Sequence, residues 1–385
     1  MPSFVSKCGE DIETIFVEYL DEIAANAQFK LYTWGRNSNG DLGDGTSVNK
    51  STPIQIGVCS WKWASVGYRT ALAIKADGTG MSWGNAGGGR LGDNTVVTKS
   101  SPVAICGTGK WKMLSGGGNF GTGIKTDGTL WAWGCNFRGQ LGDGTTVNKS
   151  TPVQIGTGTD WRCIVSSPGG YFATALKTNG TIWTWGSGAR GSLGDGTTIC
   201  KSSPVQVGAA TTWKCISLRG YGVYGWKTDG TIWHWGNVIL PASCTNVCYS
   251  TPVQFATAAD NWKIFSNTNS QHVLAVKKNG TLWAWGSNHS GQLGDGTTVD
   301  KCSPIQIGSS CDWRSTAGEF AISFAIKTDG TLWAWGTGDS GALGDATTVN
   351  KSTPIQVGFA KDWYCVSNKH LQTIGLRIFG DCSCT

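Results

Sequence analysis

A Trp-Gly pair recurs along the chain at intervals of 49, 50, 52, 50, 50 and 50 residues. Its seven copies begin at Trp34, Trp83, Trp133, Trp185, Trp235, Trp285 and Trp335. A module of this length with several short strands indicates a β-propeller blade, because one small sheet cannot bury both faces until similar sheets stack on each side. We therefore predict an all-β fold, a seven-bladed β-propeller.

Each module predicts four strands, as the copy at residues 111–156 illustrates. Between the second and third strands, Asp127-Gly128 is typical of a hairpin turn that needs positive φ. A proline opens the fourth strand, where a missing backbone donor is tolerated at a sheet edge. The fourth strand should therefore be the outer edge of each blade, and its prolines are Pro53, Pro102, Pro152, Pro204, Pro252, Pro304 and Pro354.

The ends of the chain supply the pieces of one blade. There are seven Trp-Gly pairs but only six Asp/Asn-Gly hairpins. Residues 29–34 match a third strand, and residues 363–377 match a first and a second strand. Joining them would close the ring and remove exposed sheet edges. We predict a propeller domain at 29–385 with a composite last blade, and a separate segment at 1–28.

Tryptophan is abundant, with 21 copies in 385 residues, and most copies occupy equivalent slots in the repeat. Pairs such as Trp131 and Trp133 lie two residues apart on a strand, so they share a face and should pack between blades. Trp63 and Trp226 fall outside the regular slots. These two are our candidates for a surface contact, and a sugar-binding propeller with exposed indoles is kept as an alternative.

The pattern "GTLWAWGxNxxGQLGDGTT" followed by "PVQIG" resembles the repeat of the regulator of chromosome condensation family, from about Phe29 to about Arg377. The resemblance implies a seven-bladed propeller. The founding member is a nuclear exchange factor for a small Ras-like GTPase and binds chromatin, whereas bacterial and bacteriophage relatives look like general binding or structural propellers. The near-identical loops and the wording "STPVQIG" are more similar to the latter. Only His272 occupies the family's histidine slot, and no inserted hairpin is evident, so exchange activity is not expected.

The first 28 residues differ in kind from the repeats. Their apolar residues follow helical spacing and form one stripe, consisting of Ile12, Ile15, Phe16, Tyr19, Leu20 and Ile23. The segment carries six acidic residues against Lys7, a net charge of −5. An acidic amphipathic helix is predicted, which either caps the propeller or docks into another protein. It lacks the basic start and apolar core of a signal peptide and is too charged to span a membrane.

Residues 29–385 carry 30 basic and 19 acidic side chains, a net charge of +11. Rings of lysines before the hairpins and before the prolines could attract nucleic acid or acidic glycans. Because no blade concentrates the charge, we prefer solubility and edge protection as the explanation. The aspartates of the "LGDGTT" loops predict turn capping, since one carboxylate per loop is too few for Ca²⁺. No metal or cofactor is expected.

The fifth repeat replaces this loop with an irregular stretch, residues 237–252. Its residues Val238, Ile239 and Leu240 are our candidates for a specific contact. Among 14 cysteines, Cys163, Cys215 and Cys365 share one slot and are interpreted as small core residues. A disulfide from Cys8 to Cys382 or Cys384 is left open, and no cysteine spacing indicates a zinc site.

The chain has four histidines, and none has the partners of a catalytic triad. We therefore predict no catalytic residue and no enzyme. The favoured function is a structural or adhesive propeller, a phage virion component of the tail, fibre or capsid surface. Its helix would dock onto other structural proteins and its loops would contact a host-surface glycan or protein; nucleic acid and membrane insertion are not expected. Such a protein belongs to the virion if phage-encoded and otherwise to the cytoplasm. The alternatives are an intracellular regulator that binds a small GTPase or nucleic acid, and a lectin-like propeller.

Overall fold

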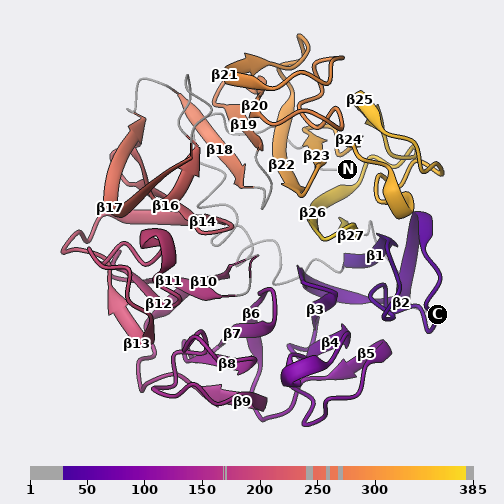
Figure 1. The fold of residues 1–385 in the computed structure, drawn as a ribbon. Helices are drawn as coiled ribbons and strands as arrows, with labels where there is room; N and C mark the ends of the chain where they lie inside the picture. The colour runs from indigo at the N-terminus through magenta and orange to yellow at the C-terminus, as the bar shows by residue number, and fades with distance from the viewer. Residues whose placement is uncertain are drawn as a thin grey trace, which may run out of the picture.

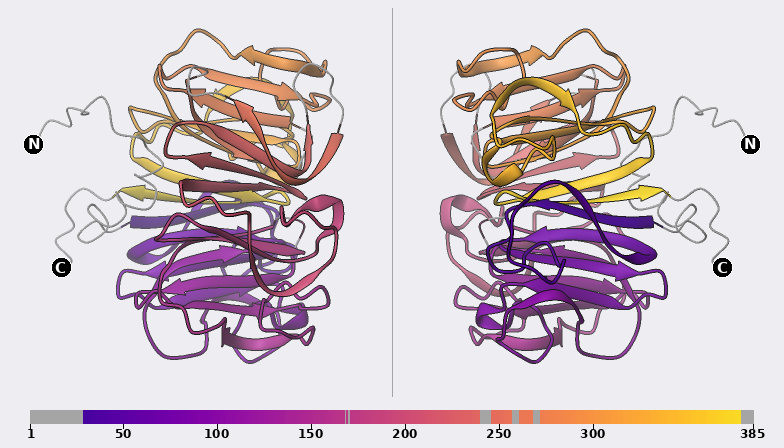
Figure 2. Two further views of the ribbon diagram at one scale, coloured as in Figure 1. Left: turned by 90° about the vertical axis from the view of Figure 1, so that its left-hand side faces the viewer. Right: turned by 90° about the vertical axis from the view of Figure 1, so that its right-hand side faces the viewer.

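The computed structural model describes residues 29–167, 169, 171–239, 246–256, 261–267 and 272–378. The predicted helix at residues 1–28 lies outside the described residues, as do Leu240, Cys8, Cys382 and Cys384. The described strands form a ring of seven four-stranded antiparallel blades, which confirms the predicted propeller (Figure 1). Figure 2 shows the twisted blades from two sides of the ring.

In each blade the first strand lies nearest the centre of the ring and the fourth lies at the rim (Figure 1). Blade 2 contains β6 (Trp111–Gly116), β7 (Phe120–Lys125), β8 (Leu130–Gly134) and β9 (Lys149–Gln154). Blade 3 contains β10 (Trp161–Ser166), β11 (Phe172–Lys177), β12 (Ile182–Gly186) and β13 (Lys201–Gln206). Blade 4 contains β14 (Trp213–Arg219), β15 (Gly222–Lys227), β16 (Ile232–Ile239) and β17 (Asn246–Ala256).

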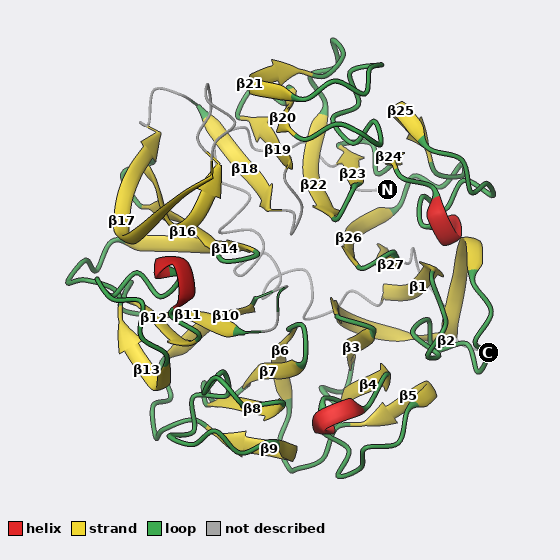
Figure 3. Ribbon diagram, viewed as in Figure 1, coloured by secondary structure: helices red, strands yellow, loops and turns green. Residues whose placement is uncertain are grey.

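Blades 5 and 6 repeat this order. Blade 5 contains β18 (Trp262–Asn267), β19 (His272–Lys277), β20 (Leu282–Gly286) and β21 (Lys301–Gln306). Blade 6 contains β22 (Trp313–Glu319), β23 (Ile322–Lys327), β24 (Leu332–Gly336) and β25 (Lys351–Gln356). The repeat prolines all lie in the fourth strands, as predicted. Among the described residues, three one-turn 3₁₀ helices lie in the loops before these strands (Figure 3), namely η2 (Gly87–Gly89), η3 (Ala189–Gly191) and η5 (Asp339–Gly341).

The two remaining blades share one long strand. Blade 7 combines β26 (Trp363–Lys369) and β27 (Gln372–Ile378) with β1 (Phe29–Gly35) and the first part of β2 (Lys50–Gly67). The second part of β2 begins blade 1, which continues with β3 (Thr70–Lys75), β4 (Gly80–Gly84) and β5 (Lys99–Ala104). β1 pairs with β27 in unbroken register from Phe29 opposite Ile378 to Gly35 opposite Gln372. This pairing confirms the composite blade that closes the ring.

The repeated tryptophans hold neighbouring blades together. The tryptophan of each of the seven Trp-Gly pairs is completely buried. The Trp83 indole donates to the Asp41 carbonyl of the preceding blade at 3.0 Å, and Trp185 donates to the Gln140 carbonyl at the same distance. Where blade 7 meets blade 6, Trp34 donates to the Ala342 carbonyl at 3.0 Å. These three indoles therefore combine apolar burial with a satisfied N–H, which a buried indole requires.

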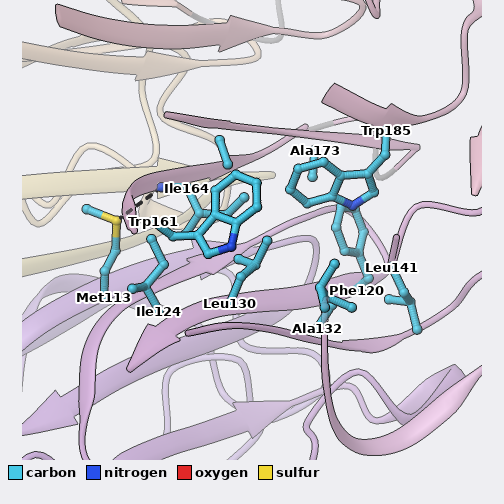
Figure 4. Close-up of a cluster of buried hydrophobic side chains, with 12 residues drawn as sticks. Met113, Phe120, Ile124, Leu130, Ala132, Leu141, Trp161, Ile164, Ala173 and Trp185 are labelled. Carbon is cyan, nitrogen blue, oxygen red and sulfur yellow. Dashed lines mark hydrogen bonds between the residues drawn. The ribbon is translucent and has the colours of Figure 1, made fainter. Parts of the chain in front are cut away.

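The first glycine of the "LGDG" loop lies at the same interface between blades. Gly142 has a φ of +80°, and a Cβ on it would lie 2.8 Å from the Trp185 indole of the next blade. Between blades 2 and 3, Met113, Ile124 and Leu130 pack against Trp161 and Ile164 (Figure 4). The glycine and the tryptophan of the repeat are thus two halves of one contact between blades.

Candidate binding face

The two faces of the ring carry different connections. The turn between the first two strands and the loop between the last two strands meet on one face, because a backbone hydrogen bond ties them within the same blade. Examples are Asn85 N–H to the Arg69 carbonyl at 2.8 Å and Ser187 N–H to the Tyr171 carbonyl at 2.7 Å. We call this the loop face. The opposite hairpin face carries the Asp/Asn-Gly turns, the links between blades, and the paired residues Phe29 and Ile378.

Arginines gather on the loop face. Of the nine arginines in the chain, five with described side chains lie in its turns and loops, namely Arg36, Arg69, Arg90, Arg138 and Arg190. Aromatic residues accompany them. We define the arginine–tyrosine face as these five arginines together with Tyr68, Phe137, Tyr171, Tyr221, Phe320 and His370. Arginine, tyrosine and other aromatic side chains are the residues that dominate the energetics of protein interfaces.

One cluster on this face joins blades 6, 7 and 1 around His370. The His370 ring lies 4.5 Å from the Tyr68 ring and 6.4 Å from the Phe320 ring, measured between centroids. The Arg36 guanidinium donates to His370 Nε2 at 2.8 Å. Burial, Arg36 and Arg69 all lower the His370 pKa. The imidazole is therefore neutral and accepts this bond, since a guanidinium has only donors.

The turns that present this cluster have an unusual backbone. Arg69, Phe320 and His370 have φ values of 59°, 61° and 47°. The corresponding turn of blade 4 has Gly220 with φ 51°. Positive φ is unfavourable for residues that carry a Cβ, and such residues concentrate at functional sites. Large side chains at these turn tips therefore mark the loop face as a candidate site, with Phe320 57% exposed.

A second cluster, the tyrosine ladder, crosses blades 2, 3 and 4. It consists of Phe137, Tyr171, Tyr221 and Arg190. Tyr171 and Tyr221 stack with centroids 5.9 Å apart and an interplanar angle of 9°. Phe137 meets Tyr171 edge-on at 6.0 Å, and the Arg190 guanidinium lies 5.5 Å from the Tyr221 ring. Phe137 is 51% exposed. Rings held in order by their neighbours lose little entropy when a partner covers them.

A buried carboxylate lies beneath the first cluster. Asp41 is 1% exposed, and burial raises its pKa to about 6, although Arg36 and Arg69 act in the opposite direction. Its backbone carbonyl accepts bonds from the Trp83 indole and the Gln372 amide. Asp41 is therefore fixed in the contact between blades, where its charge responds to pH near neutrality.

The lysine rings have partners within the chain. On the hairpin face, the Lys125 ammonium lies 3.6 Å from the centre of Trp131, and Lys227 lies 3.9 Å from that of Trp233. At the rim, Lys50 pairs with Asp44 at 3.3 Å, and equivalent pairs recur in other blades. These contacts support the structural explanation of the lysines over recruitment of nucleic acid.

The loop aspartates cap turns, as predicted. Asp44 accepts from Thr46 N–H at 3.0 Å, from the Thr46 hydroxyl at 2.8 Å and from Asn37 Nδ2 at 3.0 Å. Within the described ranges, no group of three or more His, Cys, Asp or Glu side chains could hold a metal ion. Cys163, Cys215 and Cys365 pack against the core clusters, in agreement with their predicted role.

Three of the predicted contact residues are in the wrong place for a surface role. Trp226 is 5% exposed and Val238 is completely buried, and both belong to one core cluster with Tyr224 and with Val273 of blade 5. Trp63 is half-buried, and its indole donates to the Leu114 carbonyl at 2.7 Å. The expectation failed because an irregular position in the repeat need not be exposed. The side chain of Ile239 lies outside the description.

A histidine and a serine approach each other in the core but make no catalytic pair. His272 Nε2 lies 3.0 Å from Ser323 Oγ, and both residues are completely buried. The Ser323 hydroxyl donates to the Gln292 carbonyl at 2.7 Å. The pair therefore joins blades 5 and 6 and has no path to a substrate.

The arginine–tyrosine face was not identified from the sequence. Its residues occupy variable turn positions, which a search for repeated slots passes over. One signal was available, because lysine fills the periodic positions of the repeat while most arginines lie between them.

Comparison with known proteins agrees with this architecture. The regulator of chromosome condensation (RCC1) repeat matches residues 30–74, 127–176, 179–217, 279–316 and 329–367. The Arabidopsis thaliana ultraviolet-B receptor UVR8 is 38% identical over 55 residues, 12% of each chain. The protein RCC2 homolog of Danio rerio is 25% identical over 138 residues, which are 36% of this chain and 18% of the relative. The matches thus span less than a fifth of either curated relative.

Solved structures show the same fold. Yeast RCC1 (Prp20), solved bound to Kap60, superposes with a TM-score of 0.83 and 16% identity over 99% of this chain and 95% of that chain. Human WBSCR16 gives a TM-score of 0.79 with 17% identity over 91% and 98%. A second structure of Prp20p from Saccharomyces cerevisiae, described with its binding to Gsp1p and histones, gives 0.78 with 17% identity over 94% and 95%. No helix among the described residues is long and apolar enough to cross a membrane.

Proposed function

Because the chain belongs to the regulator of chromosome condensation repeat family, we propose that it is a non-catalytic protein-binding propeller whose arginine–tyrosine face docks an acidic surface of a partner protein. The observation that carries this proposal is the segregation of the cations. Several lysines of the hairpin face lie against indoles and lysines of the rim pair with aspartates. The arginines of the loop face lie instead beside aromatic rings, of which Phe137 and Phe320 are exposed.

The chemistry of the face favours a protein partner. Arginine binds carboxylates through two parallel hydrogen bonds and stacks on aromatic rings. The tyrosine ladder offers flat, ordered rings beside Arg190 and Arg138. A partner that combines Asp or Glu side chains with an apolar or planar group would therefore contact both kinds of residue at once.

Relatives from a plant, a fish, human and yeast favour a regulatory binding protein over the virion component preferred from the sequence. The virion interpretation depended on the wording of the repeats and on residues 1–28. A lectin function depended on Trp63 and Trp226, and it is not supported by the half-buried, hydrogen-bonded Trp63 or by Trp226 in the core. The first partner to test is Gsp1p, one of the two named with the yeast relative.

The test is binding after charge reversal on one face only. Purified full chain, the triple variant R69E/R138E/R190E and the variant Y221A would be titrated against Gsp1p by calorimetry. We expect the triple variant to weaken binding by at least about a hundredfold, since several charged contacts are reversed.

The matched control is K62E/K214E/K278E, which changes the net charge equally but lies towards the hairpin face. Equal weakening by both triple variants would mean that net charge alone attracts the partner. That result, or full binding by the loop-face variant, would refute the proposed site.

A further inference from the structure

Within the part of the chain that the structure describes, the exposed large apolar side chains of the hairpin face lie in blade 7 and in the links beside it. Among the described residues, the exposed large hydrophobic side chains include a loop-face set from the third-to-fourth-strand loops and the Phe320 turn. The other three are Phe359, 97% exposed, Val58, 87% exposed, and Ile378, 37% exposed. Phe359 and Val58 lie in the links that enter and leave composite blade 7, and Ile378 ends its second strand.

Backbone hydrogen bonds and strand pairing connect the positions of these three residues at the hairpin end of blade 7. Ile378 N–H donates to the Asp362 carbonyl at 2.8 Å, three residues after Phe359. Ile378 also pairs with Phe29, and Phe29 pairs in turn with Trp61, three residues after Val58. We call Val58, Phe359 and Ile378 the blade 7 patch. It lies where the first described residue, Phe29, enters the ring.

We infer that the blade 7 patch is the docking site of the chain's own N-terminal segment, residues 10–25, through its apolar stripe. The segment has six apolar residues at helical spacing, among them Ile12, Phe16 and Ile23. An apolar stripe of this kind requires an apolar partner. The blade 7 patch supplies one on the face from which the segment begins.

The short connection to Phe29 keeps the N-terminal segment close to the blade 7 patch. Five residues, 24–28, separate the stripe from β1 and can span at most about 17 Å when extended. Ile378 pairs directly with Phe29, so the patch begins within that reach. A segment held so close has a high effective concentration at the patch, which an untethered partner must overcome.

The charges are complementary as well. The segment has a net charge of −5. Lys361 lies two residues after Phe359, and Lys75 and Lys110 are exposed on the hairpin face of the adjoining blade 1. The polar side of the segment therefore faces cations while its apolar stripe covers the patch, an arrangement that also prevents two rings from associating through exposed Phe359.

Hydrogen exchange measured by mass spectrometry on the full chain tests this inference. In the unaltered protein, we expect amides of residues 12–23 to exchange at least tenfold more slowly than unstructured amides, at every protein concentration. The double variant V58S/F359S should remove most of this protection. F137S, which removes an exposed aromatic ring from the loop face, should leave it unchanged.

A second variant, F16S, alters the segment instead of the patch, and near-ultraviolet circular dichroism would verify that each ring is folded. It should lose the same protection and should expose the amides around residues 357–362. Unprotected amides in the unaltered chain would overturn the inference, as would protection that survives V58S/F359S. Protection that grows with concentration would assign the patch to a second copy, and protection gained only with histones or Gsp1p would assign it to a partner.

Discussion

Single glycines set how closely two blades approach. Gly142 combines a φ of +80° with direct contact to the Trp185 indole, so its lack of a Cβ serves two purposes at once. Gly156 has a φ of +63° but no atom within 4 Å of the position where a Cβ would lie. The two positions therefore separate the backbone cost of a side chain from its steric cost.

We expect Gly142→Ala to lower the free energy of unfolding by roughly 2–4 kcal/mol, because it adds a clash to the backbone strain. Gly156→Ala should cost only about 1 kcal/mol, from backbone strain alone. Urea titration followed by tryptophan fluorescence measures both values. Equal losses in the two variants would show that the Trp185 contact adjusts without cost.

The raised pKa of Asp41 predicts that the stability of the folded chain depends on pH. Burial raises its pKa from 3.8 to about 6 in the folded chain. A carboxyl whose pKa is raised by folding stabilises the native state when protonated, so this contribution is complete below pH 3.8 and is lost as the pH rises through 6. Asp41→Asn should therefore stabilise the protein by up to about 3 kcal/mol above pH 7.

Thermal melts of Asp41→Asn and of the unaltered chain would check the sign of this effect on stability. They would run from roughly pH 3.5 to pH 8, a range that includes both pKa values. The two curves should converge in acid and diverge towards pH 8. A constant difference across this range would mean that the Asp41 charge is already compensated by Arg36 and Arg69.

At the scale of the element, the loop between the last two strands is organised by a single amide. Asn136 is completely buried. Its Nδ2 donates to Asp143 Oδ1 at 2.9 Å, to the Thr145 carbonyl at 3.1 Å and to the Val147 carbonyl at 3.2 Å. Its Oδ1 accepts from Leu141 N–H at 3.0 Å. The Asn136 side chain thus supplies hydrogen bonds to loop backbone groups that have no partner in a strand ladder.

We expect Asn136→Ala to lower stability by about 2–3 kcal/mol, because several buried groups lose their partner. The Leu141 amide should exchange faster than in the unaltered chain, whereas the Leu91 amide in the corresponding loop of blade 1 should not change. Asn119→Ala, in a turn of the same blade, is the control. If its effect matched that of Asn136→Ala, the loop would owe its shape to other contacts.

The elements that could be predicted from the sequence are those that recur in several repeats. The Asp/Asn-Gly hairpins, the edge prolines and the Trp-Gly slots follow local rules of turn geometry and side-chain alternation. The arginine–tyrosine face could not be predicted in this way, since Arg69, Tyr221 and His370 come together only when turns far apart in sequence meet on one side of the ring. Val238 was misplaced because β16 extends to Ile239 and carries it into the core.

At the scale of the whole molecule, closure depends on one pairing between distant segments. β1 and β27 pair along seven residues, and β1 also pairs with β2. Without β27, β1 would lose its inner neighbour and blade 6 would meet a partial sheet. Repeat proteins gain their stability from contacts between neighbouring units, so an open ring loses one interface and exposes sheet edges.

Truncation after residue 371 should therefore abolish cooperative unfolding and promote association, whereas truncation after residue 378 should leave the ring closed. Thermal melts and light scattering distinguish the two products. The shorter truncation removes no residue of the β1–β27 ladder, which makes it the matched control. A cooperative, monomeric melt after removal of β27 would show that six blades and part of a seventh close on their own.

Rearranging the chain tests closure without removing any strand. Phe29 and Ile378 face each other in the ladder, so a short linker can join them while new ends open at the hairpin between Asp127 and Gly128. If the position of the chain ends matters only for strand pairing, this permutant of residues 29–378 should have nearly the melting temperature of the parent lacking residues 1–28. The difference should be within a few degrees, about the shift that 1 kcal/mol produces. Because the new opening leaves β7 and β8 to pair as end strands, the same two-ended closure is rebuilt in blade 2. A melt far below that of the parent would mean that blade 7 has closing properties that blade 2 lacks, located in the contacts of Phe29 with Tyr364 and of Trp34 with Trp363.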